Sequence, residues 1–379
     1  MNAKDVTWIK RPQALQEFCD DSQGQPLAVD TESDHFHAYQ ARICLFQVAT
    51  PKRIALIDPL QLDEGDLQPL FERFLDPNQL KILHAAQNDL GELTRDYGVS
   101  INNLFDTRVA ARFLGTDKNS LSWLLENLLG VDAGPSFSRF DWSTRPLPDR
   151  ATRYAAQDVA HLLTLQQRFD PLLNEQGWLD AFSQTCAHIA STTQYQPSDF
   201  DPQGWASIKG ADKLDGASRT ILSRLYQWRH RRCTELNRAA FLIFPDRLLA
   251  SLARHQITDP QAIVDHSYAT AFANKYADEI ADVIVDARAY PPPPMPTKDS
   301  RRRPDPEQRQ LYDALRSWRN QTARSLDIPG EYIGTNALFR SLCEEPPASK
   351  TKLADAPGIL PWHVDLFGDD LMAIFQTHA

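Results

Sequence analysis

Short apolar runs alternate with stretches of helical period along the first 170 or so residues, and this alternation constrains the fold more than any other feature. The runs PLAVDTE, ARICLFQVAT, RIALID and KILHAA have the length and composition of strands. Between and after them lie DLQPLFERFL and NDLGELTRDYG, in which apolar residues recur with a helical period. Strands interleaved with helices are typical of an α/β domain, and we expect one at residues 1–200.

The pattern changes along the chain. From about Leu104 it becomes mostly helical, with DTRVAARFLG, SLSWLLENLLG and a long helix expected at about 149–169. From about Trp205 onward, apolar patterns of helical length recur without a convincing strand. We therefore predict that the rest of the chain is all-α.

A proline run divides the helical half. PPPPMP at 291–296 cannot continue a helix and favours a stiff extended spacer. On either side lie two similar phrases, LSRLYQWRHRRCTELN at 222–237 and LYDALRSWRNQTARSLDIP at 311–329, each followed by a short apolar helix. We expect a tandem repeat of one small helical module, at 201–290 and 305–379, joined by a linker at 291–304.

The net charge of −10 is not spread evenly. Residues 1–200 hold 17 basic and 27 acidic side chains, whereas residues 201–379 hold 23 of each. Within 201–259 there are ten Lys or Arg against six acids, which fits either a basic nucleic-acid-binding face or an ordinary solvated helix surface.

The composition indicates an intracellular globular protein. Five scattered cysteines without CxxC spacing favour neither a disulfide framework nor a zinc site. The sequence has no run of about 18 apolar residues that could span a bilayer, so no membrane role is expected. The segment MNAKDVTWIKRPQ lacks the apolar centre of a secretion signal. We expect a cytoplasmic protein with no obligate protein partner.

Three segments carry candidate catalytic residues. Asp30 and Glu32 end an apolar strand two residues apart, so their side chains share one face, although such a pair also occurs in exposed turns. Asp89 lies where a strand runs into a helix, and a plain helix-start residue is the alternative. Tyr154 and Asp158 lie four residues apart in a helical pattern and share a helix face.

The order of these segments resembles the DEDD exonuclease superfamily in its DEDDy branch, and most closely the ribonuclease D family. VDTE, HAAQNDL and YAAQD correspond to the three family motifs, and the flanking phrases ARICLFQVAT, LFDT and DWSTRPLPDRATRYAAQDVAHLL are similar too. The Trp228-Arg229 and Trp318-Arg319 phrases, with IKG at 208–210 and LADAPGILPWHVDLFGDDLMAIF, resemble two HRDC domains.

The resemblance implies a fold and a reaction. The fold is a ribonuclease H-like exonuclease domain with a mixed sheet flanked by helices, followed by two small all-α HRDC-like domains. The reaction is metal-dependent 3′→5′ hydrolysis of RNA with a free 3′ end, which releases nucleoside 5′-monophosphates, with tRNA precursors as the implied substrates.

The resemblance also assigns roles to the five residues. Asp30 bridges two divalent ions, Mg²⁺ or Mn²⁺, while Glu32 and Asp158 complete the ion on the nucleophile side. Asp89 supports the ion on the leaving-group side, mostly through water. Tyr154 orients or helps to deprotonate the attacking water, and an ordinary tyrosine pKa of about 10 favours positioning.

Other residues near the motifs are weaker candidates. Gln47 and His84 lie close to the motifs and either contact substrate or make structural hydrogen bonds, of which we expect the second. Asp106 is expected to give structural support. Phe36, His37 and Tyr39 follow the first motif and either stack on a base or pack within a loop.

One loop departs from the family pattern. The family often has a Lys and a Gln where this chain has Pro135 and Ser138, while Arg139 remains. The resemblance therefore assigns no substrate contact to those two positions.

Two alternative functions fit the same residues. The carboxylates do not distinguish ribose from deoxyribose, so a proofreading or Werner-type DNA exonuclease is one alternative. A non-catalytic RNA-binding scaffold is the other, and the intact acids argue against it.

Overall fold

The N-terminal part of the chain is built on a mixed sheet, as the sequence predicted. The computed structural model describes residues 5–195, 199–296 and 305–378. Its six strands lie in the order β1-β4-β3-β2-β5-β6. β2 and β3 pair antiparallel, as do β3 and β4, whereas β1–β4, β2–β5 and β5–β6 are parallel. The strands are β1 Asp5–Ile9, β2 Leu27–Ser33, β3 Ile43–Ala49, β4 Arg53–Ile57, β5 Lys81–Leu83 and β6 Leu104–Asp106.

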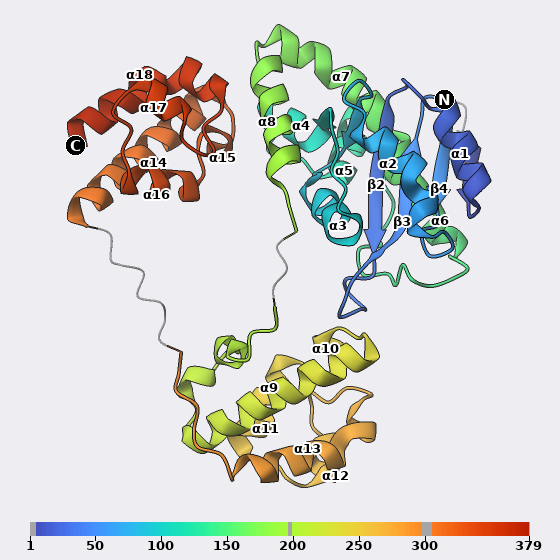
Figure 1. The fold of residues 1–379 in the computed structure, drawn as a ribbon, viewed down its shortest axis with the longest axis vertical. Coiled ribbons are helices and arrows are strands. Elements are labelled where there is room, and N and C mark those ends of the chain that lie inside the picture. The colour runs from blue at the N-terminus through green and yellow to red at the C-terminus, as the bar shows by residue number, and fades with distance from the viewer. Residues whose placement is uncertain (1–4, 196–198, 297–304, 379) are drawn as a thin grey trace.

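Helices flank both faces of this sheet (Figure 1). On one face Phe46 of β3 packs against Phe71 and Phe74 of α2 and Tyr97 of α3. On the other face α6 crosses β2, β3 and β4. The helices of this part are α1 Pro12–Asp21, α2 Gln68–Leu75, α3 Gln87–Tyr97, α4 Thr107–Phe113, α5 Leu121–Leu124, α6 Asp149–Ala160, α7 Leu162–Glu175 and α8 Leu179–Thr192.

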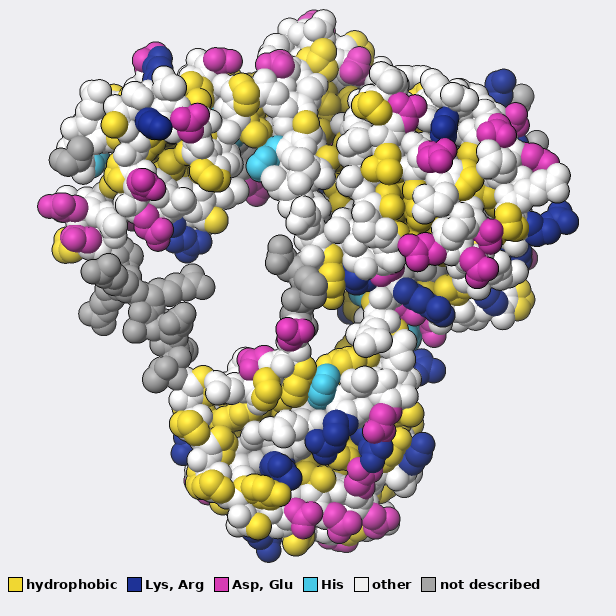
Figure 2. All heavy atoms as spheres, in the orientation of Figure 1, with side chains coloured by type: hydrophobic (Ala, Val, Ile, Leu, Met, Phe, Trp, Pro, Cys, Tyr) yellow, Lys and Arg dark blue, Asp and Glu magenta, His cyan; other side chains and the backbone are white. Residues whose placement is uncertain are grey.

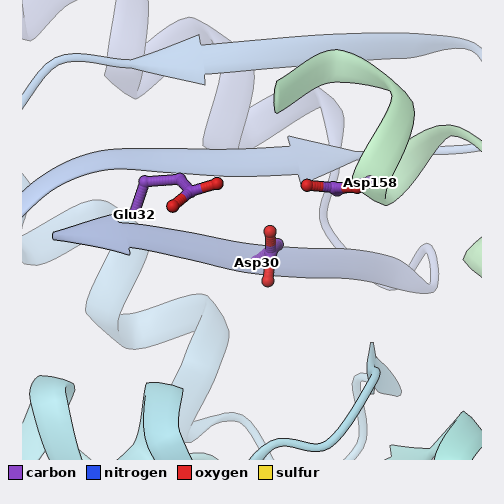
Figure 3. Close-up of side chains that lie close together, drawn as sticks. All are labelled: Asp30, Glu32 and Asp158. Carbon is purple, nitrogen blue, oxygen red and sulfur yellow. The ribbon is translucent and has the colours of Figure 1, made fainter. Parts of the chain in front are cut away.

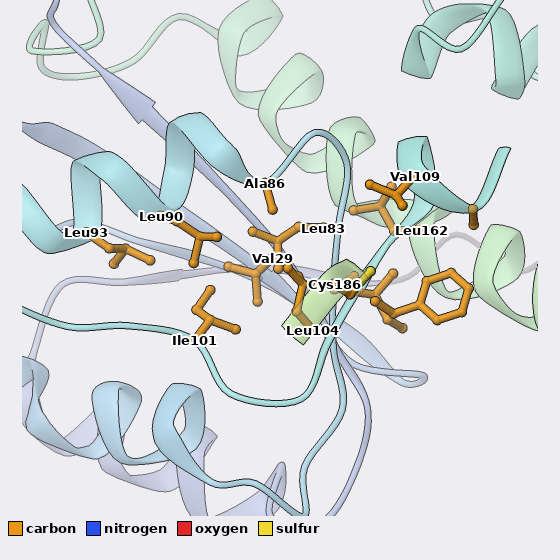
Figure 4. Packing of buried hydrophobic residues seen from close by; sticks show 14 of the residues in the cluster. Val29, Leu83, Ala86, Leu90, Leu93, Ile101, Leu104, Val109, Leu162 and Cys186 are labelled. Carbon is orange, nitrogen blue, oxygen red and sulfur yellow. The ribbon is translucent and has the colours of Figure 1, made fainter. Parts of the chain in front are cut away.

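The sheet and its helices share a dry core (Figure 4). Val29 and Leu83 from the strands meet Leu90 of α3, Leu162 of α7 and Cys186 of α8, and each is at most 1% exposed. Burying side chains of this size stabilises a fold by about 1.5–3 kcal/mol each. This core fixes the positions from which the candidate site residues project.

The first helical module has a core of its own. It comprises α9 Gly216–Leu236, α10 Ala240–Ile243, α11 Asp246–His255, α12 Pro260–Val264 and α13 Ala273–Ala287. Trp228 is 1% exposed at its centre, and its indole N–H donates to Glu279 Oε1 at 2.8 Å. Basic side chains are scattered among acidic ones over the face of this module in Figure 2.

The second helical module repeats the first. It comprises α14 Pro306–Leu326, α15 Gly330–Ile333, α16 Asn336–Glu344, α17 Lys350–Ala354 and α18 Pro361–His378. In each copy the arginine after the tryptophan donates to a backbone carbonyl shortly before the next long helix. Arg229 Nη1 lies 2.7 Å from Phe244 O, and Arg319 Nη1 lies 2.8 Å from Gly334 O. This shared contact supports the tandem repeat.

The second module and the N-terminal part form one continuous apolar cluster. The rings of Phe113 in α4 and Tyr332 stack with centroids 5.1 Å apart. Trp362 of α18 packs edge-on against Phe113 and Trp178, and its backbone N–H donates to Gln184 Oε1 at 3.0 Å.

The first module contacts the loop that follows β2. Asn237, in the left-handed conformation at the end of α9, accepts hydrogen bonds from the backbone N–H groups of Tyr39 and Gln40 at 3.1 and 2.8 Å. The Ala239 N–H donates to His37 O at 2.9 Å. The chain just past Glu32 is thus tied to the first module.

Three secondary-structure expectations were incomplete. β1 and β6 were not predicted, because five and three residues are too few to show a clear period. The helix expected at 149–169 is two helices, because α6 ends at Ala160 and α7 begins at Leu162, with His161 between them at φ −114° and ψ −2°. Apolar residues continue through this break, so the sequence pattern does not reveal it. No helix in the described part of the chain is both long and apolar enough to cross a bilayer.

A substitution in the shared core tests whether the second module is part of the N-terminal body. Trp362 is 2% exposed, and Trp362→Ala should destabilise the protein by about 3–5 kcal/mol. Hydrogen exchange should rise in α8 as well as in α18. Leu366→Ala is the matched control on the same helix, because Leu366 is 55% exposed. Exchange that rises only within α14–α18 would mean that the module folds independently.

Candidate active site

Strand β2 presents two carboxylates on one face. Asp30 and Glu32 alternate with Thr31 along β2, and both carboxylates project toward Asp158 of α6 (Figure 3). One oxygen from each of the three acids lies within 4.8 Å of the others. The structure therefore brings together three of the four carboxylates that the sequence singled out.

The sheet explains why this part of β2 is open. β5 pairs with β2 only at Leu27 and Ala28, so the edge of β2 beyond Ala28 is free of a strand. Asp89 of α3 accepts the Thr31 backbone N–H at this edge, while α6 brings Asp158 over the face of the sheet. A parallel ladder that ends early leaves a gap at the strand ends, where α/β proteins commonly place their sites.

Asp89 lies beside this group but outside the set of three. It is in the first turn of α3, 7% exposed, and its Oδ1 accepts from the Thr31 backbone N–H at 3.0 Å and from the Thr31 hydroxyl at 2.5 Å. Thr31 points to the opposite face of β2 from Asp30. Asp89 is thus fixed against the same strand and lines the same cavity as the other three acids.

The four acids raise the pKa values of one another. Burial, and then the charge of Asp158, raise the pKa of Asp30 well above its ordinary range. Burial and the Asp30 charge raise the pKa of Glu32 to about 10, and they also raise the pKa of Asp89. Burial raises the pKa of Asp158 to about 7, although a hydrogen bond from Tyr154 acts against this. The site is short of positive charge.

Tyr154 is held by its helix and by aromatic neighbours. Its hydroxyl hydrogen-bonds to Asp158 one turn along α6. Its ring lies 5.2 Å from that of Phe137 and 6.2 Å from that of Trp142. Burial, followed by the charges of Asp158, Glu32 and Asp30, raises the pKa of Tyr154 above its ordinary value. The phenol is suited to holding a group in place rather than to accepting a proton at neutral pH.

The acids lie in a cavity of about 940 Å³. Pockets of about 300–1,000 Å³ take small-molecule ligands, so this cavity is at the large end. Sequence reasoning missed three residues that line it: Glu92, Arg95 and Tyr195. The three-residue steps from Asp89 to Glu92 and from Glu92 to Arg95 could have indicated the first two. No local pattern connects Tyr195 to the site.

Asp106 has the structural partners that the sequence analysis expected. Its carboxylate accepts from the Ala85 and Ala86 N–H groups at 3.0 and 2.8 Å, and from the Arg108 N–H at 2.8 Å. It thereby joins the turn before α3 to the start of α4.

The structure separates the two other polar candidates. His84 Nδ1 lies 3.0 Å from Thr107 Oγ1, and burial lowers its pKa to about 4, so the ring is neutral. The Gln47 side chain is fully buried, and among the described residues neither its amide nitrogen nor its amide oxygen has a hydrogen-bond partner. The prediction that Gln47 makes a structural hydrogen bond is therefore wrong for these residues. β3 places Gln47 directly opposite Asp30, on the face covered by α6.

Some residues of the loop after β2 and of the loop at 135–139 line the cavity, and others make contacts between segments. Phe36 and Ser138 line the cavity, whereas Pro135 is not among its described lining residues. His37 Nε2 lies 3.0 Å from Arg139 O, and the Tyr39 hydroxyl lies 2.8 Å from His230 Nδ1. Base stacking is open to Phe36, while His37 and Tyr39 serve contacts between segments.

Comparison with known proteins agrees with this geometry. A family model described as 3′-5′ exonuclease matches residues 6–174, and an HRDC domain model matches residues 218–284 and 308–375. Ribonuclease D of Pseudomonas paraeruginosa is 28% identical over 387 residues, which cover 100% of this chain and 99% of that protein. The chain belongs to the ribonuclease D family. The expected fold class is confirmed.

Two further matches extend the family. The crystal structure of Escherichia coli RNase D, described as an exoribonuclease involved in structured RNA processing, is 25% identical with a TM-score of 0.65, over 98% of this chain and 99% of that one. The exosome complex exonuclease RRP6 of Saccharomyces cerevisiae is 27% identical over 296 residues, or 74% of this chain. The chain spans 28% of the length of Arabidopsis thaliana protein RRP6-like 2 and 40% of that of the yeast protein.

The donor set fits divalent cations. The 3′-5′ exonuclease domain family uses such ions, and Asp30, Glu32 and Asp158 form an acidic group able to hold one. Carboxylate oxygens are the ligands that hard cations prefer, and bound cations offset the repulsion that raises these pKa values.

The raised pKa values predict a pH-dependent response to metal. The folded protein holds the protons of Asp158 and Glu32 more tightly than the unfolded chain does, because their pKa values are raised to about 7 and about 10. The resulting contribution to the free energy of unfolding is fully present below the ordinary carboxyl pKa. It is lost as the pH rises through about 7 for Asp158 and about 10 for Glu32. The melting temperature of the EDTA-treated protein should therefore fall between about pH 6 and about pH 8.5. Added Mn²⁺ should raise it more at the higher pH.

Asp30→Asn is the control for this response. This substitution removes a negative charge from the centre of the carboxylate group. The rise in melting temperature that Mn²⁺ causes, measured by calorimetry, should therefore be much smaller. A shift of the same size at both pH values, or in Asp30→Asn, would contradict metal binding by these carboxylates.

Proposed function

We propose that this chain is a 3′→5′ exoribonuclease that releases nucleoside 5′-monophosphates from RNA, with two divalent ions, Mg²⁺ or Mn²⁺, held by Asp30, Glu32, Asp89 and Asp158. The proposal rests on one observation: the carboxylates of Asp30, Glu32 and Asp158 lie close together in one large cavity. The Tyr154 hydroxyl is hydrogen-bonded to Asp158 beside them. We further propose an exonuclease domain at 1–200, HRDC-like domains at 201–290 and 305–379, and a linker at 291–304.

The chain's own residues divide the work of phosphodiester hydrolysis. When bound, divalent ions supply an activated water, charge neutralisation on the phosphate and support for the departing 3′-oxygen. Thr31 fixes one oxygen of Asp89, and the α6 spacing sets Tyr154 beside Asp158. Tyr154 stays protonated because its pKa is raised, and it donates its O–H to Asp158. Its phenol oxygen then orients the attacking water by accepting a hydrogen bond from it.

Several observations support RNA as the substrate. The relatives that align over nearly the whole chain are named Ribonuclease D. Residues 201–259 hold ten Lys or Arg against six acids, a local excess of positive charge within the first two thirds of the first helical module, which favours a polyanionic partner. Maturation of tRNA 3′ ends in the cytoplasm is the proposed role.

Loss of Asp30 tests the proposed chemistry. The protein should shorten a 5′-labelled RNA oligonucleotide one nucleotide at a time in Mg²⁺ or Mn²⁺ and release 5′-monophosphates. Asp30→Ala should lower this rate at least about 100-fold, since several kcal/mol of transition-state stabilisation are lost. Asp20→Asn, an exposed acid on α1, is the control and should retain the wild-type rate.

Two outcomes would select the alternatives. Clear preference for a matched DNA oligonucleotide with a free 3′ end would indicate a DNA exonuclease. Metal-dependent release that survives Asp30→Ala would exclude this site, and RNA binding without any release would indicate a non-catalytic scaffold.

Tyr154→Phe separates positioning from metal binding. Removal of the hydroxyl should lower kcat about 10- to 100-fold, because the water loses an orienting partner. The Mn²⁺-induced shift in melting temperature should remain. Tyr268→Phe, in the first helical module and 39% exposed, is the matched control. An unchanged kcat would remove Tyr154 from the catalytic set.

A further inference from the structure

The cavity extends beyond the carboxylates. From Asp89 its lining continues along α3 through Glu92 to Arg95, six residues or about 9 Å farther along the helix axis. It is completed there by Thr193, Gln194 and Tyr195, which follow α8. At about 940 Å³ the cavity has room for more than the single nucleotide that is being removed.

Arg95 is the cation in this second part of the cavity. Among the described lining residues it is the sole Lys or Arg, while several of the others are acids. RNA carries a negative charge on every phosphate, so a cavity that admits it favours a fixed cation away from the metal ligands. The arginine fork is suited to a phosphate because it donates two parallel hydrogen bonds.

Asp96 holds Arg95 in a fixed orientation. Arg95 Nε and Nη2 donate to Asp96 at 2.6 and 3.0 Å, and the Arg95 side chain is 17% exposed. Asp96 Oδ2 also accepts the Ile43 N–H at 2.6 Å, which fastens the pair to the start of β3. Within the described part of the chain no hydrogen bond engages Arg95 Nη1, so it retains N–H donors for a further acceptor.

Tyr195 adds an aromatic surface beside this cation. Its ring centroid lies 5.8 Å from the Arg95 guanidinium carbon, and the residue is 43% exposed. Exposed aromatic rings beside basic side chains are typical of sites that stack single-stranded bases. Arg95 and Tyr195 together therefore offer one donor group for a phosphate and one surface for the adjoining base.

The two ends of the cavity differ in exposure. Asp89 is 7% exposed among the carboxylates, whereas Tyr195 lies at an open edge. A polynucleotide cut near its 3′ end must extend out of the cavity on its 5′ side. We propose that Arg95 and Tyr195 form a subsite for the nucleotide 5′ of the scissile phosphate, with Arg95 binding its phosphate and Tyr195 stacking its base. This inference rests on the proposed exonuclease function.

Two substrates separate this subsite from the chemistry. One is an RNA oligonucleotide, and the other is the p-nitrophenyl ester of thymidine 5′-monophosphate, which has no upstream nucleotide. Arg95→Ala and Tyr195→Ala should each lower kcat/KM for RNA about 10-fold more than kcat/KM for the ester, chiefly through KM. Tyr195→Phe should restore the RNA value, because stacking needs the ring and not the hydroxyl. Lys52→Ala, an exposed cation in the β3–β4 turn, is the control.

Salt dependence gives a second readout. With EDTA present to prevent cleavage, the slope of log Kd for RNA against log salt should decrease by about 1 in Arg95→Ala and stay unchanged in Tyr195→Ala. Equal losses on both substrates would overturn the subsite, since Arg95 would then act on the terminal nucleotide or on folding. RNA kinetics and salt slope like those of the wild type in both variants would also overturn it. Failure of the wild-type protein to cleave the RNA would instead refute the proposed function.

Discussion

Mutual repulsion among four half-buried or buried carboxylates is the constraint on which the site depends. Each carboxyl group has a raised pKa because neighbouring charges and burial disfavour its ionised form. Acids held this close separate unless a rigid scaffold fixes them or cations neutralise them. The scaffold is supplied by β2, whose unpaired edge beyond Ala28 is contacted by α3 and whose face is covered by α6, and by the apolar core beneath these elements.

The helical modules extend this scaffold in different ways. The second module shares an apolar cluster with α4 and α8 through Trp362, so it is built into the body that carries the site. The first module has a separate core and contacts the loop after β2 through Asn237. His37 of that loop contacts the backbone carbonyl of Arg139, and the loop that contains Arg139 also carries Phe137, whose ring packs on Tyr154. The first module is thus linked through two loops to the aromatic residues around Tyr154.

Local periodicity predicted which side chains share a face within one element, while the resemblance to the exonuclease family assigned them to a site. Asp30 and Glu32 follow from the two-residue repeat of a strand, and Tyr154 and Asp158 from the four-residue repeat of a helix. Contacts between elements were out of reach. Nothing near Gln47 in the sequence indicates that it faces Asp30, and the approach of Tyr195 to Arg95 joins segments 100 residues apart. The strands β1 and β6 were missed because a short strand owes its identity to its partners rather than to its own pattern.

The central claim is that these carboxylates hold the cations that cleave RNA. A crystal structure with Mn²⁺ and a short RNA, with anomalous differences collected at the manganese absorption edge, tests it most directly. The account predicts two anomalous peaks between Asp30, Glu32, Asp89 and Asp158, against the phosphate nearest the RNA 3′ end. Peaks located elsewhere, or an RNA 3′ end bound away from this cavity, would contradict it.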